Sequence, residues 1–195
     1  EALQAGAAED PKLRVQFLGS LERLVERQTN LIQDLLDISK LDSGSETNWQ
    51  SEVNISQVIS DAVDQIRPQA DKKELAISTQ ITLESGGQDL VLVGNANQLQ
   101  RALLNILTNA VKYTPASGFI NINVRSLGGE RLEIRIQDSG GGIDAADLPR
   151  IFERFYRADK SRTRESGNPG GTGLGLAIVR EIVARHHGTV EVEST

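Results

Sequence analysis

Apolar residues near the start of the chain recur at alternating spacings of four and three, the a/d pattern of packed helices. This seam runs through Phe17, Leu21, Leu24, Gln28, Leu31, Leu35 and Ile38. A second apolar row beside it consists of Leu18, Val25 and Ile32. The combined stripe is wider than a two-stranded coiled coil requires and is typical of a four-helix bundle. Asp10 and Pro11 fit an N-cap and a first helical position, so we predict a helix over residues 12–42.

A mixed pattern follows a polar, turn-rich stretch at residues 43–54, which we interpret as a linker. Helical periodicity predicts helices over residues 54–72, 96–112 and 173–186. Alternating or short apolar runs predict strands over residues 75–81, 90–93, 120–124, 132–136 and 189–193, the second of them buried. Asn54 can cap the first helix, and Pro68 is expected to kink or shorten it. This order predicts a two-layer α/β sandwich, with helices on one face of a mixed sheet, preceded by the long helix of a helical hairpin.

Composition narrows the possible partners. A net charge of −6 argues against nucleic acid or an anionic membrane surface as the main partner. The absence of cysteine excludes disulfides and thiol nucleophiles, and the two histidines, His186 and His187, are adjacent, which leaves little room for a zinc site or a catalytic triad. No apolar run reaches membrane-spanning length and no signal peptide opens the chain. We expect the sequence to be a piece of a longer protein.

Three short segments carry candidate chemistry, and the first lies on a predicted helix. Asn105, Asn109 and Lys112 fall at i, i+4 and i+7, so they share one helix face. Asparagine oxygens can ligate Mg²⁺ without adding negative charge beside phosphates. A lysine supplies a positive point charge to phosphates. Taken alone, the same pattern also fits a solvated polar stripe.

The second segment, Asp138–Ile143, follows a predicted strand. A carboxylate at a strand end can accept a hydrogen bond from an exocyclic amino group such as that of adenine. The glycines at 140–142 allow backbone to approach a planar base, and Ile143 could form an apolar wall. The alternative is a glycine-rich turn capped by Asp138.

The third segment, Gly171–Leu176, runs directly into an apolar helix, where glycines expose backbone amides to an anion. It does not follow a strand and has no lysine after its last glycine, so it is neither a Rossmann nor a Walker A loop. The polar, basic stretch 157–170 before it fits a lid over a nucleotide or a plain surface loop. Phe152 and Phe155 are expected to anchor a loop to the core.

As an ordered set, these residues resemble sensor histidine kinases of two-component signalling. Asn105–Tyr113 resembles the N box, Asp138–Ile143 the G1 box, Ile151–Arg157 the F box and Gly171–Leu176 the G2 box. The helix ending in Leu35–Leu41 resembles the second helix of the dimerisation and phosphotransfer hairpin. The resemblance implies the Bergerat ATPase fold, with ATP and Mg²⁺ as cofactors.

The resemblance also implies roles for single residues. Asn109 would ligate Mg²⁺, with Asn105 nearby on the polyphosphate side, and Lys112 and Arg157 would contact the phosphates. Asp138 would bind the adenine amino group. The full set of implied ligand-binding residues is Asn105, Asn109, Lys112, Tyr113, Asp138, Gly140, Gly142, Ile143, Arg157, Gly171, Thr172, Gly173, Leu174, Gly175 and Leu176.

By resemblance, residues 1–45 would be part of the dimerisation and phosphotransfer region, and 46–195 the ATP-binding domain without its last strand. The activity would be transfer of the ATP γ-phosphoryl group to a histidine and onward to an aspartate of a response regulator receiver domain. The family's acceptor histidine is absent here, and His187 with Gly188 resembles a helix terminator instead. The full-length protein would be a homodimer, cytoplasmic in this part and open to anchoring in the inner membrane by upstream segments.

Two alternatives remain open at this stage. The chain could be another ATPase of the gyrase, chaperone, mismatch-repair or anti-sigma group, although the helix at 12–42 and the Phe152–Phe155 segment disfavour it. It could also be a non-catalytic docking module for a response regulator, with the helix at 12–42 as its binding face. We expect this chain to bind Mg-ATP without phosphorylating itself.

Overall fold

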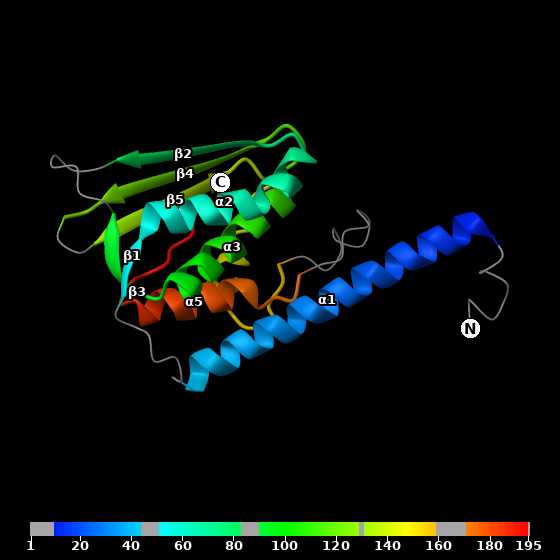
Figure 1. Cartoon of the computed structure of the whole chain (residues 1–195), viewed down its shortest axis with the longest axis horizontal. Coiled ribbons are helices and arrows are strands. Elements are labelled where there is room, and N and C mark those ends of the chain that lie inside the picture. The colour runs from blue at the N-terminus through cyan, green and yellow to red at the C-terminus, as the bar shows by residue number, and fades with distance from the viewer. Residues whose placement is uncertain (1–9, 44–50, 83–89, 129–130, 159–170, 195) are drawn as a thin grey trace.

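A computed structural model describes residues 10–43, 51–82, 90–128, 131–158 and 171–194 of the chain. Its first element is the long helix α1, Pro11–Ser43, which confirms the predicted helix at 12–42. The Asp10 carboxylate accepts a hydrogen bond from the Lys12 amide at 2.8 Å, so Asp10 caps the helix as expected. The N-terminal half of α1 projects away from the rest of the molecule (Figure 1). No helix in the described part of the chain is long and apolar enough to cross a membrane.

The main sheet contains three strands, β2 (Ala76–Thr82), β4 (Phe119–Ser126) and β5 (Leu132–Asp138), in the order β2-β4-β5. Strand β2 is parallel to β4, and β5 is antiparallel to it, so the sheet is mixed as predicted. Strands β1 (Ser51–Asn54) and β3 (Val91–Gly94) form a separate antiparallel pair.

Helices α2 (Ile55–Asp71) and α3 (Ala96–Tyr113) begin at asparagine caps. The side-chain oxygen of Asn54 accepts from the Gln57 amide at 3.2 Å, and that of Asn95 accepts from the Gln98 amide at 3.1 Å. Pro68 does not end α2, which continues to Asp71. The remaining helices are the 3-10 turn η2, Leu148–Arg150, and α5, Gly175–Arg185.

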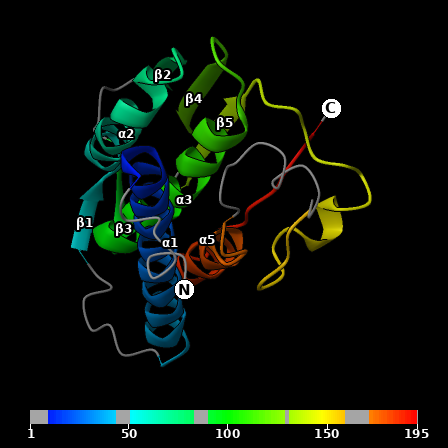
Figure 2. The same ribbon diagram turned by 90° about the vertical axis from the view of Figure 1, so that its right-hand side faces the viewer.

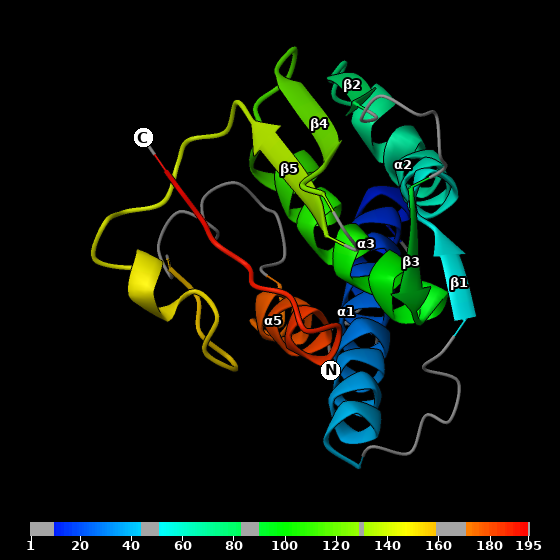
Figure 3. The same ribbon diagram turned by 90° about the vertical axis from the view of Figure 1, so that its left-hand side faces the viewer.

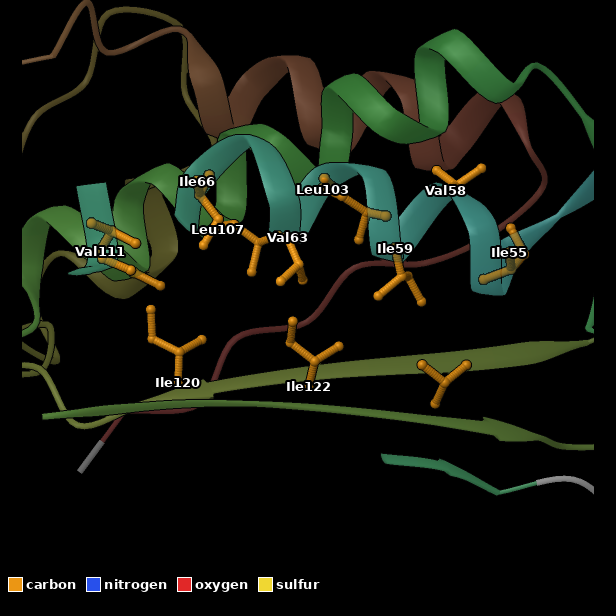
Figure 4. Packing of buried hydrophobic residues seen from close by; sticks show 14 of the residues in the cluster. Ile55, Val58, Ile59, Val63, Ile66, Leu103, Leu107, Val111, Ile120 and Ile122 are labelled. Carbon is orange, nitrogen blue, oxygen red and sulfur yellow. The ribbon is translucent and has the colours of Figure 1, made fainter. Parts of the chain in front are cut away.

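The core lies between the sheet and helices α2 and α3 (Figure 4). Ile120 and Ile122 point from β4 toward the helices and are at most 1% exposed. Facing them are the buried residues Ile55, Ile59, Val63, Ile66, Leu103 and Leu107. The opposite face of the sheet carries polar side chains that include Gln80, Asn123 and Arg135. One apolar and one polar face explain the alternation along β4.

A second apolar cluster joins α1 to the sandwich. It contains the buried residues Leu41, Ala102, Leu174, Ile178, Val179 and Ile182, with Leu31 and Ile38 packed against it. Only the C-terminal part of α1 takes part, and Figure 2 shows this part beside α5. The contact therefore places α1 against the helix that follows the glycine segment.

Three sequence expectations about elements were wrong. Residues 189–193 form no strand, because none of the described residues pairs with them; the chain runs past α5 as a coil (Figure 3). The strand predicted as buried at 90–93 is half exposed, since Val91 and Val93 face solvent at the edge of a two-stranded pair. The supposed linker at 43–54 ends in β1, which pairs with β3. Residues 1–9, 44–50 and 159–170 lie outside the described residues, as do the expected turn at 86–87 and most of the expected lid.

Candidate functional site

The polar face of α3 lies against the glycine segment that opens α5. A Cβ atom added to Gly175 would lie 3.4 Å from the side-chain oxygen of Asn105. A Cβ atom added to Gly171 would lie 3.6 Å from the ammonium nitrogen of Lys112. Two segments that are more than sixty residues apart in sequence therefore form one site, as the sequence predicted.

The N-terminus of α5 has free backbone donors. Its N-cap residue, Leu174, makes no side-chain capping hydrogen bond, and the first helical bond runs from the Ile178 amide to the Leu174 carbonyl at 2.9 Å. The amides of the first turn therefore have no helical acceptor. Such a terminus favours an anion, and the Lys112 ammonium beside it adds positive charge.

Asn105 provides an independent sign of a ligand. Its side-chain nitrogen is buried and has no hydrogen-bond partner among the described residues. Buried polar groups are nearly always paired in folded proteins, so an unpaired amide here indicates a group that the bound ligand would satisfy. Asn109 lies one turn further along the same face and is half-buried.

The turn after β5 is shaped by a glycine. The Gly140 amide donates to the Asp138 carboxylate at 2.8 Å. A Cβ atom on Gly140 would lie 2.5 Å from that carboxylate oxygen and 3.1 Å from the Tyr113 carbonyl oxygen, so no larger residue fits without movement. The turn brings Asp138 to the end of α3 that carries Lys112 and Tyr113. The second carboxylate oxygen of Asp138 accepts no hydrogen bond within the described part of the chain.

The outer residues of this turn are placed less tightly. Gly142 has a φ of 72°, a left-handed conformation that favours glycine. The Ile143 amide donates to the Ser194 hydroxyl at 2.7 Å, which ties the turn to the last described residues. The Tyr113 ring is 58% exposed and lies 5.0 Å from the Lys112 ammonium, so it borders the site without being packed into the core.

The segment Ile151–Arg157 packs on the glycine loop through its backbone. The Phe155 amide donates to the Gly173 carbonyl at 2.8 Å, and a Cβ atom on Gly173, whose φ is 76°, would lie 2.8 Å from the Phe155 carbonyl carbon. The expectation that Phe155 anchors this segment to the core was wrong, because its ring is 61% exposed. Ile151, at 8% exposure, is the buried residue. Arg157 is half-buried and forms no ion pair with the described residues.

Tyr156 is held in the same segment by two contacts. Its hydroxyl donates to the Asp147 carboxylate at 2.6 Å, and the Arg150 guanidinium lies 4.2 Å from the ring centre. Because the hydrogen bond to Asp147 requires the phenol proton, it raises the pKa of Tyr156.

Sequence reasoning missed a group of charged residues between α1 and the site. Arg101 lies 2.6 Å from one Asp34 carboxylate oxygen, and the Thr172 hydroxyl donates to the other at 2.6 Å. Near the end of α1, Arg154 forms two hydrogen bonds to Asp42, at 2.9 and 3.2 Å. The only available signal was that these aspartates interrupt the apolar stripe of the long helix.

Comparisons with known proteins agree with this geometry. A family model described as histidine kinase-, DNA gyrase B-, and HSP90-like ATPase matches residues 94–195, just over half of the chain. The chain therefore belongs to this ATPase family. It is also 32% identical over 194 residues to the sensor-like histidine kinase SenX3 of Mycobacterium tuberculosis. That alignment covers 100% of this chain and 45% of the relative, so the chain spans less than half of the relative's length.

Solved structures of sensor histidine kinases share the fold. The mycobacterial sensor histidine kinase MprB matches with a TM-score of 0.59 and 28% identity, over 71% of this chain and 80% of that one. Full-length ShkA in complex with AMPPNP matches with a TM-score of 0.69 and 24% identity, over 90% of this chain and 34% of that one. Histidine kinase ThkA in complex with the response regulator protein TrrA matches with a TM-score of 0.67 and 19% identity, over 92% and 46% of the two chains.

Proposed function

We propose that this chain is the ATP-binding catalytic core of a sensor histidine kinase. In the full protein it would transfer the γ-phosphoryl group of ATP to a histidine, and a response regulator aspartate would then receive it. The observation that carries the proposal is the contact between the Asn105 and Lys112 face of α3 and the uncapped N-terminus of α5. The bound AMPPNP, an ATP analogue, in the similar structure of ShkA supports a nucleotide as the ligand.

The phosphates would bind between α3 and the glycine loop. Lys112 would contact them with its ammonium group, and the loop amides from Gly173 to Leu176 would donate hydrogen bonds to them. Asn105 would use its unpartnered amide nitrogen on the polyphosphate side. Arg157, near the start of the expected lid, would contact the phosphates from the opposite side. Since phosphoryl transfer needs mainly positioning and charge neutralisation, these groups would supply most of the catalysis.

The base would bind at the turn after β5. The second oxygen of Asp138 would accept from the adenine amino group, while the first already holds the Gly140 amide. Gly142, Ile143 and Tyr113 would surround the ring. The exposed position of Tyr113 is consistent with a side chain that covers a ligand.

The donor set also fits Mg²⁺. Asn109 would hold the ion through its neutral amide oxygen, a ligand type that Mg²⁺ accepts when phosphate oxygens and waters complete its shell. The ion would neutralise charge on the phosphates. Asn105 on the same helix face would help to orient Asn109 and the phosphates.

Residues 1–45 would belong to the dimerisation and phosphotransfer region, and residues 46–195 to the ATP-binding domain. Apolar side chains that are 40 to 69% exposed cover much of α1: Leu13, Val15, Leu18, Leu21, Leu24, Val25, Ile32, Leu35 and Leu36. In the full protein a second copy would cover this stripe and form a homodimer. The complex of ThkA with TrrA supports a receiver domain as a further partner.

The isolated 195-residue chain would bind Mg-ATP without phosphorylating itself, as a docking module would. Its two histidines end α5. His186 accepts from the Asn95 amide at 3.0 Å through Nε2, and its Nδ1 lies 2.8 Å from the Ile182 carbonyl. His187 has a φ of 56° and donates its amide to Ala184, while the Gly188 amide donates to Val183. These bonds form a Schellman motif, which confirms the predicted helix terminator.

Titration calorimetry with Mg-AMPPNP tests the proposal. We expect binding by the wild-type chain and loss of about tenfold or more in affinity for Asp138→Asn and Lys112→Ala, because each loses a charge-assisted contact. Asn123→Ala, on the polar face of the sheet, is the control and should bind normally. Failure of the wild-type chain to bind any nucleotide would overturn the proposal. Stable label from γ-labelled ATP on the chain would contradict the absence of self-phosphorylation.

A further inference from the structure

The carboxylate of Asp34 is buried in a helix that is otherwise largely exposed. Asp34 is 6% exposed, and it and Leu41 are the two buried residues of α1. A buried carboxylate is costly unless charged or hydrogen-bonded partners compensate for its lost hydration. The partners of Asp34 therefore show what this part of α1 is built to contact.

Asp34 joins α1 to both halves of the candidate site. Its Oδ1 atom accepts from Arg101 at 2.6 Å, and Arg101 lies on α3 one turn before Asn105. Its Oδ2 atom accepts from the Thr172 hydroxyl at 2.6 Å, and Thr172 lies in the glycine loop. A single carboxylate thus connects the long helix, the polar helix and the loop.

The contact also determines how the loop uses its own amides. The Thr172 oxygen, whose proton is directed at Asp34, accepts from the Leu174 amide at 3.2 Å. This amide is one of the donors that the proposed function assigns to phosphate. While Thr172 is held by Asp34, the Leu174 amide is therefore bonded inside the loop.

The charges of this cluster act in the same direction. Asp37 lies 2.8 Å from the Nε atom of Arg101, so Asp34 and Asp37 place two carboxylates around one guanidinium. The net charge of the three side chains is negative. A negative cluster touching the loop at Thr172 opposes the approach of polyphosphate, and partial burial reduces its screening by water.

We propose that Asp34 is a positioning residue that holds the glycine loop in a resting arrangement, so that phosphate binding and the docking of α1 on the loop oppose each other. The proposal rests on the proposed function, in which residues 171–176 bind the phosphates of a nucleotide. Phosphate binding draws the Leu174 amide away from Thr172 and weakens the Thr172–Asp34 bond. By linkage, whatever detaches α1 from the loop strengthens nucleotide binding by the same factor.

Asp34→Asn tests this relationship with little change in shape. We expect it to bind Mg-AMPPNP about three- to tenfold more tightly than the wild-type chain, the effect of one lost hydrogen bond that opposes binding. Asp37→Asn is the matched control, because it removes the same charge and leaves the Thr172–Asp34 bond in place. Its effect should be smaller. Equal or weaker binding by Asp34→Asn overturns the proposal, and so does equal tightening by both variants.

A second variant acts from the other end of the contact. Thr172→Val keeps the size of the side chain and removes its hydroxyl, which frees the Leu174 amide. It should also tighten binding, and in the double variant with Asp34→Asn it should add little, because both changes break one interaction. Weaker binding by Thr172→Val, or full additivity, contradicts the proposal and remains measurable if Asp34→Asn fails to fold.

Hydrogen exchange gives a readout that a purely structural role would not change. In the wild-type chain, nucleotide should speed exchange of the α1 amides from about residue 31 to 43, since it loosens their attachment. In Asp34→Asn this response should be lost. A wild-type chain that binds no nucleotide overturns the proposed function and this inference together. A chain that binds nucleotide with slower or unchanged exchange in α1 overturns this inference alone.

Discussion

The ammonium group of Lys73 lies 2.9 Å from the carbonyl oxygen of Lys112, at the end of α3. Lys73 also donates to the carbonyls of Val111 at 2.8 Å and Thr114 at 3.0 Å. Its three donors therefore satisfy carbonyls that a helix end leaves unpaired, and its charge complements the helix dipole. Lys73 thereby fixes the backbone from which the Lys112 and Tyr113 side chains reach the candidate site.

Replacing Lys73 with methionine should lower the free energy of unfolding by about 1–3 kcal/mol, since buried carbonyls lose their partner. It should also weaken nucleotide binding, because Lys112 is less well positioned. Urea unfolding and calorimetry measure the two effects. Lys72→Met, at an exposed neighbouring position, is the control with the same change of charge. Equal effects of the two variants would show that the contacts of Lys73 contribute nothing.

Gly140 and Gly141 should respond very differently to alanine. A Cβ atom on Gly140 would collide with the Asp138 carboxylate, whereas a Cβ atom on Gly141 would meet nothing within 4 Å. We expect Gly140→Ala to lose about 1–3 kcal/mol of stability as the turn shifts, and Gly141→Ala to stay within about 0.5 kcal/mol of wild type. Urea unfolding of both variants provides the comparison. A tolerant Gly140 would mean that the close packing against Tyr113 is not required.

The ring of His186 should be important for the contact between α5 and the start of α3. Phenylalanine at this position would leave the Asn95 amide without its acceptor at Nε2 and remove the contact to the Ile182 carbonyl. We expect a loss of about 1–3 kcal/mol in unfolding free energy. His187→Asn serves as the control, since asparagine tolerates the left-handed backbone found there. Similar stabilities for the two variants would contradict the role given to His186.

The pair formed by Arg154 and Asp42 should give α1 a pH-dependent attachment. The hydrogen bond from Arg154 holds the pKa of Asp42 below its ordinary value of 3.8, while slight desolvation acts the other way. A lowered pKa in the folded state means that the contribution is present above the ordinary value and is lost as pH falls through the lowered one. Carboxyl NMR titration should show the low pKa, and Arg154→Gln should return it toward 3.8. An unchanged titration in that variant would rule out the pair.

Local patterns predicted most elements of the fold. Asn54 and Asn95 cap helices whose apolar periodicity was clear from sequence, and the β4–β5 hairpin follows its alternating residues. The strand expected at 189–193 has the right alternation, but a strand also needs a partner for its backbone, and alternation carries no information about that partner.

The candidate site was predictable to a similar extent. Spacing on one helix face placed Asn105 beside Lys112, and chain order suggested that the glycine loop would meet them. The bond between Asp34 and Thr172 joins residues 138 positions apart, and no local rule connects an aspartate on a helix with a threonine in a loop. Phe155 shows the opposite error, because an aromatic residue in a polar segment was taken for a core residue although its backbone makes the contact.

The attachment of α1 at one end turns the helix into a lever. The packed and charged contacts begin near Leu31, while about twenty residues before it project from the body. At 1.5 Å per residue this arm is about 30 Å long, so a tilt of about 10° at the attachment moves its tip by about 5 Å. A change of sub-ångström size beside the nucleotide loop would therefore arrive at the far end as a displacement comparable to one helical turn.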